Sequence, residues 1–153
     1  MAGTSAVATI EAELALLLRR AEATRRAGNQ AHRALDRAAY VILRQLDESG
    51  PANVGALASG LGVDASTATR QIAAMERDHL VRRGRDPDDG RGTVISATAN
   101  GLTKYRAVRR ARAELYESIL AGWSEADQRT LAAMLHRLNA SLDAHMRGQA
   151  SKS

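Results

Sequence analysis

The chain has 153 residues, a formal net charge of +5 and no cysteine, and 44% of its residues are hydrophobic and 25% charged. This balance is typical of a soluble globular protein with one compact domain, or one domain with a dimerisation arm. The missing cysteine excludes disulfides, thiolate metal sites and thiol-based redox sensing. No apolar run approaches the ~20 residues that span a bilayer. Because the first ten residues also lack a signal-peptide pattern, we expect a cytoplasmic protein.

The positive charge is concentrated in one third of the chain. Residues 65–112 contain eleven Lys or Arg and five Asp or Glu, whereas the remaining residues have nearly equal numbers of each sign. Concentrated positive charge raises affinity for the polyanionic backbone of a nucleic acid. A solvated basic face is the simpler alternative, and charge alone does not exclude it.

Two helices are predicted before residue 50. Ile10, Leu14, Leu17 and Leu18 recur at spacings of three and four, which indicates a helix over residues 10–27 that ends at Gly28-Asn29. A second helix is predicted over residues 31–47. Ser49-Gly50-Pro51 ends it, because proline cannot continue a helix and displaces the residue before it from the helical region.

Two shorter helices follow, joined by a turn that contains a glycine. The first is predicted over residues 54–60 with Asn53 as its N-cap, and the second over residues 65–79 with Asp64 as its N-cap. The inward positions of the second helix are Ala68, Ile72, Met75 and His79. This arrangement is typical of a helix-turn-helix.

A β-hairpin and two long helices complete the chain. Strands are predicted over residues 80–85 and 93–97, and the charged loop 86–92 between them is rich in turn-forming residues. Thr98 caps a helix to about residue 120, and Ser124 caps a last helix with an apolar seam over residues 131–146. A hairpin directly after a helix-turn-helix is a wing. The sequence therefore predicts an all-α fold with a small β-hairpin, the winged helix-turn-helix.

Short polar and basic side chains are expected on the outer face of helix 65–79, where they would reach base edges and phosphates in a major groove. The candidate DNA-binding residues of this helix are Ser66, Thr67, Thr69, Arg70 and Arg77. The hairpin adds Arg83, Arg85 and Arg91, and an arginine on a thin hairpin can enter the minor groove. We expect Asp86 to pair with Arg91 and hold it extended. The alternatives are ordinary helix caps and an ordinary exposed ion pair.

A small-molecule site is a further hypothesis. His32, Arg33, Asp36 and Tyr40 combine an imidazole, a guanidinium and an aromatic ring, which would suit an aromatic carboxylate. The alternative is that all four are surface residues. We predict no cofactor and no metal: His32 and Asp36 are one helical turn apart, but a solvated helix face explains them more simply. The loop that begins at Asp86 does not fit a calcium-binding EF-hand, because Gly90 is its fifth residue rather than its sixth.

Two other functional classes are alternatives to DNA binding. A small metal-dependent enzyme is disfavoured because the sequence has no HExxH, P-loop or GxSxG motif. A helical protein–protein interaction module without DNA binding would explain the seam over residues 131–146 but not the arginine-rich hairpin. Salt separates these possibilities, because a phosphate binder loses affinity steeply as salt rises.

The sequence resembles the multiple-antibiotic-resistance regulator family, MarR. The resemblance is carried by residues 64–70 (DASTATR), 75–81 (MERDHLV), the wing 86–92 (DPDDGRG) and its exit 95–101 (ISATANG). In one departure, Ala97 stands before Thr98 where the family usually has a larger apolar residue.

The resemblance implies a homodimer that binds a palindromic double-stranded DNA site, commonly as a repressor. Residues of about 31–100 would form the DNA-binding winged helix, and those of about 10–30 and 101–147 the dimerisation helices. Helix 65–79 would lie in the major groove, with Arg91 in the flanking minor groove. Many members release DNA when a phenolic or other small aromatic ligand binds between the two parts.

Overall fold

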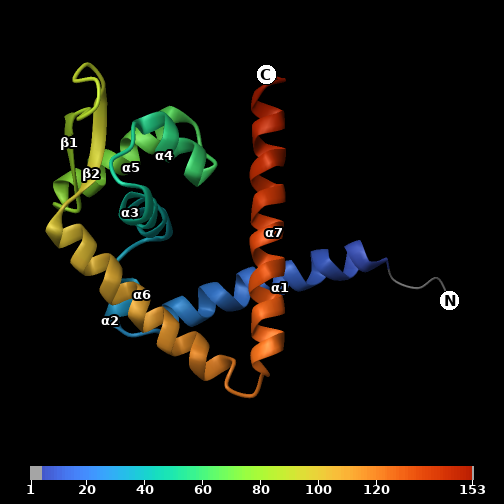
Figure 1. Cartoon of the computed structure of the whole chain (residues 1–153). Coiled ribbons are helices and arrows are strands. Elements are labelled where there is room, and N and C mark those ends of the chain that lie inside the picture. Colours follow the sequence, from blue (N-terminus) through green and yellow to red (C-terminus); the bar gives the residue numbers. More distant parts are fainter. Residues whose placement is uncertain (1–4, 153) are drawn as a thin grey trace.

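The structure is a computed structural model that describes residues 5–152. Seven helices and a two-stranded antiparallel sheet make up this part of the chain (Figure 1). In chain order the elements are α1 (Ala6–Ala27), α2 (Gln30–Arg33), α3 (Arg37–Ser49), α4 (Val54–Leu61), α5 (Ala65–Arg77), β1 (Val81–Arg85), β2 (Thr93–Ala97), α6 (Ala99–Ile119) and α7 (Glu125–Ala150).

The molecule consists of a packed lobe and long helices that extend from it. The lobe holds α3, α4, α5 and the hairpin, and α6 leads away from it to a turn (Figure 1). From this turn α7 runs back toward the end of the molecule where the hairpin tip lies. A Cβ atom on Gly62, between α4 and α5, would lie 2.8 Å from the Met146 sulfur of α7. Within the described residues, no helix is long and apolar enough to cross a membrane.

The hydrophobic core lies inside the lobe and along the first half of α6. The α3 stripe contributes Ile42, Leu43 and Leu46, all of them buried. The inward face of α5 contributes Ala68, Ile72 and Met75, as predicted. The other buried hydrophobic side chains are Leu35, Ala39, Leu57, Ala58, Leu80, Val81, Val94, Ile95, Tyr105 and Val108. Burial of these side chains orients α5 so that its opposite face is exposed.

Backbone hydrogen bonds join the second strand of the hairpin to the lobe. Val81 pairs with Ala97, and Arg85 with Thr93, at the two ends of the sheet. Ala52, in the loop between α3 and α4, exchanges two backbone hydrogen bonds with Ile95 at 3.1 and 2.8 Å. Ala97 is half-buried against the core, so the small residue at the wing exit still packs.

Two expectations about local structure were wrong. The helix predicted over residues 31–47 is two helices, because Asp36 acts as the N-cap of α3: its Oδ1 accepts a hydrogen bond from the Ala39 N–H at 2.7 Å. His79, predicted to point inward, has an exposed side chain. It lies just past the end of α5 with a φ of 57°, and this left-handed residue turns the chain into β1.

Candidate nucleic-acid interface

The first turn of α5 is fixed by its N-cap. Asp64 accepts hydrogen bonds from the Thr67 N–H at 2.7 Å and from the Ser66 hydroxyl at 2.8 Å. These bonds, led by the Thr67 backbone bond, lower the pKa of Asp64 from 3.8 to about 2. The helix therefore begins with an ionised, well-bonded cap, and the polar side chains that follow it have defined directions.

The hydroxyl groups of α5 already have partners within the helix. Thr69 Oγ1 donates to the Ala65 carbonyl at 2.8 Å, and Ser66 Oγ donates to Asp64. Thr67 is half-buried rather than fully outward, and its Oγ1 accepts from Arg70 Nη2 at 3.4 Å. Ser66 and Thr69 are exposed, so their oxygens are accessible as acceptors. Their hydroxyl hydrogens would have to rotate away from these partners to bind a phosphate.

Arginines lie along α5 and β1, and Arg85 at the end of β1 is exposed. Arg70 and Arg77 are exposed on α5. Arg83 of β1 donates to Glu76 of α5 at 2.9 Å, so this side chain ties the hairpin to the helix. Arg83 remains 38% exposed, whereas Arg70 and Arg77 are in no ion pair within residues 5–152.

The tip of the hairpin is ordered by two aspartates. Asp86 Oδ1 accepts from the Asp88 N–H at 2.8 Å, and the Asp86 N–H donates to the Gly92 carbonyl at 2.8 Å. Asp89 Oδ1 accepts from the N–H groups of Arg91 and Gly92 at 2.8 and 3.1 Å, and these bonds lower the Asp89 pKa. The backbone around Arg91 is thus held at several points while its side chain is exposed.

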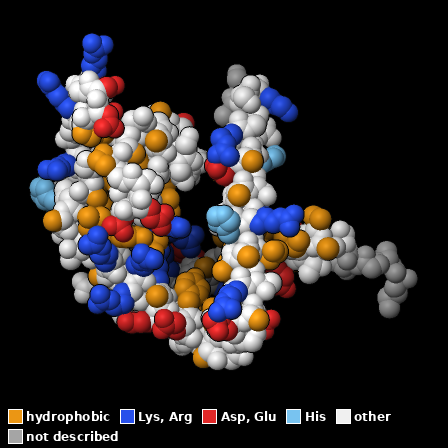
Figure 2. All heavy atoms as spheres, viewed as in Figure 1, with side chains coloured by type: hydrophobic (Ala, Val, Ile, Leu, Met, Phe, Trp, Pro, Cys, Tyr) orange, Lys and Arg blue, Asp and Glu red, His pale blue; other side chains and the backbone are white. Residues whose placement is uncertain are grey.

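One predicted contact at the tip does not form. The ion pairs of residues 5–152 include none between Asp86 and Arg91. The physical reason is that Asp86 bonds the backbone of the turn instead. Figure 2 shows Lys or Arg side chains that stand out from the end of the hairpin. The turn, rather than a side-chain pair, therefore supports the basic tip.

Comparison with known proteins agrees with this geometry. Residues 35–93 match the model of the MarR family. The chain is 38% identical to YxaD of Bacillus subtilis (strain 168), an uncharacterized HTH-type transcriptional regulator, over 91% of this chain and 96% of the relative. The chain belongs to the MarR family. It is a transcriptional regulator of that family with the winged-helix fold.

Two further relatives extend the comparison. The HTH-type transcriptional repressor IacR of Pseudomonas putida is 29% identical over 66% of this MarR-family chain and 60% of the relative. A MarR family protein of Bacillus stearothermophilus with a solved structure is 26% identical, with a TM-score of 0.66, over 88% of this chain and 96% of the other. The resemblance to the family predicted from the sequence is confirmed by these matches.

The four residues predicted for a ligand site already have partners in this MarR-family chain, except Arg33. His32 Nε2 lies 3.0 Å from the Ala111 carbonyl of α6, and Asp36 is the α3 cap. Tyr40 contacts the Tyr105 ring, with 5.1 Å between centroids, and the Arg112 guanidinium lies over the Tyr40 ring at 4.1 Å from its centroid. Arg33 is exposed. His32 and Tyr40 thus contact α6 and Asp36 contacts α3 and α5, while the buried Nδ1 atom of His32 has no hydrogen-bond partner within the described residues.

A pocket that sequence reasoning missed lies on the other side of α3. It has a volume of about 290 Å³ and is lined by Arg37, Ala38, Val41, Leu61, Val63, Thr67 and Gln71. Its walls come from α3, the end of α4 with the turn after it, and α5. No sequence signal predicts it, because its residues are separated by up to thirty-four positions.

The described part of the chain holds no group of three or more His, Asp or Glu that could bind a metal.

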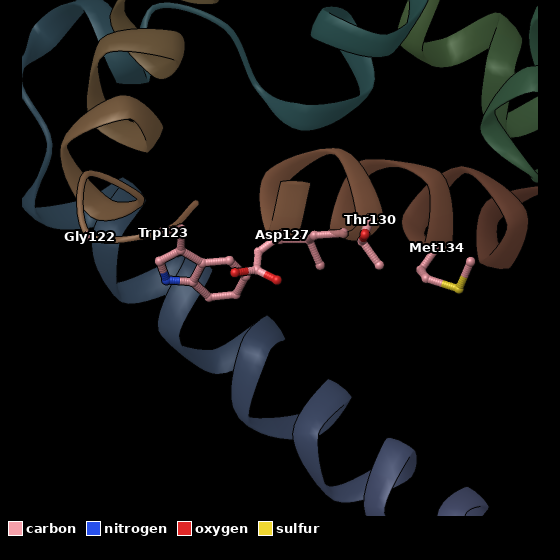
Figure 3. A pocket seen from close by; sticks show the side chains of 6 residues that line it. Gly122, Trp123, Asp127, Thr130 and Met134 are labelled. Carbon is pink, nitrogen blue, oxygen red and sulfur yellow. The ribbon is translucent and has the colours of Figure 1, made fainter. Parts of the chain in front are cut away.

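The long helices expose a large apolar surface. None of the described side chains of α1 or α7 is buried. On α1, Val7, Ile10 and Leu18 are 73%, 52% and 62% exposed. A pocket of about 580 Å³ lies at the turn between α6 and α7, where Trp123 stands beside the α7 face that carries Thr130 and Met134 (Figure 3).

Proposed function

We propose that this chain is a sequence-specific DNA-binding repressor that acts as a homodimer on a palindromic operator. The observation that carries the proposal is the pairing of an exposed basic face on α5 with an ordered hairpin tip that presents Arg91. An exposed helix of this kind fits the major groove, and a basic hairpin fits the flanking minor groove. Arg70 and Arg77 would contact base edges or phosphates. The family assignment supports the same role.

The proposed division of the chain follows its burial. Residues of about 31–100 would bind DNA, and those of about 10–30 and 101–147 would form the dimer. Large contiguous apolar surfaces mark interaction sites in soluble proteins. The exposed apolar side chains of α1, the α6–α7 turn and α7 form such a surface, and a second copy of the chain presents the same helices. Two copies would place two α5 helices on one duplex, which matches a two-fold symmetric operator.

Repression and its release are the finer parts of the proposal. The name of the Pseudomonas putida relative, a repressor, supports a repressing role. We propose the pocket beside α3 as the place where a small aromatic effector would bind, in preference to the four residues inferred from the sequence. Its apolar walls, from Val41, Leu61 and Val63, suit a ring. Arg37 bonds Glu22 through Nη2, and its remaining guanidinium N–H groups would suit an acidic group.

Titration of duplex DNA at low and moderate salt tests the proposal. A random-sequence duplex and a duplex enriched from a random pool would be compared by fluorescence anisotropy, with the mass of each complex measured in parallel. We expect two chains per duplex, tighter binding to the enriched sequence, and a steep loss of affinity as salt rises. Binding to no duplex at low salt would refute the proposal and favour the interaction-module alternative.

Two arginine variants locate the contacts. Arg91→Ala is expected to weaken operator binding without changing the unfolding midpoint, because the tip is exposed. Arg70→Ala is expected to reduce discrimination between operator and random duplex by about 1–3 kcal/mol if it contacts a base, and to weaken both equally if it contacts a phosphate. Arg44→Ala is the matched control, because this arginine is 60% exposed on α3, outside α5, the hairpin and the dimer helices, and bonds Glu48 of its own helix. Equal losses of operator affinity in Arg91→Ala and Arg44→Ala would exclude the wing from DNA binding.

A further inference from the structure

A polar contact ties α5 to the start of α3. Gln71 Nε2 of α5 lies 3.3 Å from both carboxylate oxygens of Asp36, to which it donates. Asp36 Oδ1 also accepts from the Ala39 N–H as the N-cap of α3. The two residues are thirty-five positions apart, so this bond joins segments that only the fold brings together. Gln71 follows Arg70 directly, and any rotation of α5 that breaks the contact also moves Arg70.

The same point of α3 is held by α1. Arg37, the first residue of α3, donates through Nη2 to Glu22 Oε2 at 2.9 Å. Glu22 is also bonded to Arg25 and Arg26, and the bond with Arg25 contributes most to lowering the Glu22 pKa. Glu22 is therefore ionised at neutral pH. Two contacts therefore meet at the start of α3: Arg37 bonds Glu22 of α1, and its chain neighbour Asp36 bonds Gln71 of α5.

This set of contacts is separate from the core that folds the lobe. Ala68, Ile72 and Met75 anchor α5 by burial, whereas Asp36 is exposed and Gln71 half-buried. Hydrogen bonds at such positions add little to stability, because water replaces them readily. They do have directional geometry, which apolar packing lacks. The contact between Asp36 and Gln71 is therefore better suited to orient α5 than to stabilise the fold.

We propose that Asp36 and Gln71 are positioning residues that fix the orientation of α5 relative to α1. This inference rests on the proposed function, in which α1 belongs to the dimer surface and α5 contacts DNA. The contacts would then transmit the geometry of the dimer to its two α5 helices. Their consequence is a preference for one distance between the two halves of the operator.

A double-mutant cycle tests the proposal. Gln71→Glu places a second carboxylate against Asp36 and breaks the contact. Asp36→Asn combined with Gln71→Glu restores a donor and an acceptor, keeps an N-cap residue, and leaves the net charge of the wild type. Gln71→Met removes the contact without adding charge. The single variant Asp36→Asn completes the cycle.

The readout is the spacing preference, which a merely structural role would not move. Each protein would be titrated with the enriched operator and with copies in which one or two base pairs are inserted at the centre. Each inserted pair rotates one half-site by roughly a tenth of a turn, so a rigid dimer should discriminate strongly. We expect Gln71→Glu and Gln71→Met to lower the affinity ratio between native and altered spacing by about tenfold. The double variant should recover it.

The controls separate this inference from the proposed function. Gln45→Glu adds the same charge on α3 and removes a different bond, the one that Gln45 Nε2 donates to the Ala56 carbonyl. It should therefore weaken binding to all duplexes equally. If the wild type binds the operator and Gln71→Met has the same affinity ratio between native and altered spacing, the positioning role alone is overturned. Failure of the double variant to recover the ratio would overturn it as well. Absence of wild-type binding to any duplex would refute the proposed function, and the positioning role with it.

Discussion

The junction between the hairpin and α6 depends on a glycine. Gly101 is buried in the first turn of α6, and a Cβ atom there would lie 2.0 Å from the Leu80 carbonyl oxygen and 3.1 Å from Leu43 Cδ2. Carbon and oxygen atoms ordinarily approach no closer than about 3.3 Å. Because Leu80 O is backbone at the start of β1, Gly101→Ala must move α6 away from the hairpin by more than a rotamer change could absorb.

The cost of Gly101→Ala follows from what this movement breaks. The Thr98 N–H donates to Leu80 O at 3.0 Å, and Thr98 Oγ1 donates to His79 O at 2.6 Å. These two hydrogen bonds contribute about 1 kcal/mol each. Strain from an added methyl group in a packed site costs about 1–3 kcal/mol, while the better helix propensity of alanine returns up to about 1 kcal/mol. The net expected loss is roughly 2–4 kcal/mol in the free energy of unfolding.

Urea unfolding measures this loss against a matched control. Gly148 is inside α7, and a Cβ atom there would have no heavy atom within 4 Å. Gly148→Ala should therefore stabilise the chain by about 0.5 kcal/mol, a part of the full helix-propensity difference because the site is near the helix end. Both variants would be unfolded at one protein concentration, since dimer stability depends on it. A Gly101→Ala midpoint at or above that of the wild type would refute the argument from close contact.

Three further predictions test other parts of the structure. His79→Gly should raise the free energy of unfolding by about 0.5–1 kcal/mol in urea, because glycine accommodates the φ of 57° and the lost side chain is exposed; an unchanged midpoint would contradict this. The Asp64 cap contributes stability above its unfolded pKa near 3.8 and loses it as the pH falls through about 2. Asp64→Asn should therefore reduce the loss of unfolding free energy between about pH 4 and 2. A pH dependence of the unfolding free energy as steep as that of the wild type would exclude a contribution of the cap. Leu142→Asp, at a site 51% exposed, should halve the mass in sedimentation without changing the circular dichroism of the lobe; a retained dimer would place the interface elsewhere.

The sequence was sufficient for the elements whose signals are local. Spacing and turn chemistry alone predicted the turn between α4 and α5 and both hairpin strands. Capping chemistry predicted the N-caps Asn53, Asp64, Thr98 and Ser124. The break between α2 and α3 was missed because apolar residues keep a helical period across it. The available signal was Asp36 itself, a strong N-cap residue inside an apparently continuous helix.

The parts that could not be predicted depend on distance in space. The bridge of Ala52 with Ile95 and the bond of Gln71 with Asp36 join residues far apart in the chain, and neither leaves a periodic pattern. The pairing predicted between Asp86 and Arg91 failed for the opposite reason. The Asp86 carboxylate has a nearer backbone partner in the turn, the Asp88 N–H, and a short local hydrogen bond forms more readily than a pair between flexible side chains.

The exposed helices connect stability with DNA binding. A helix packed on nothing is marginal in water, because most helical stability in proteins comes from burial of an apolar face. The described side chains of α1 and α7 bury no such face within one chain, yet Glu22 of α1 is part of the contacts that lead to α5. Dissociation of the proposed dimer would therefore loosen α1 and break its bond to Arg37, so that α5 loses its connection to α1 at the same time. When the protein is diluted and the dimer dissociates, each chain should therefore bind a half-site more weakly than one subunit of the intact dimer does.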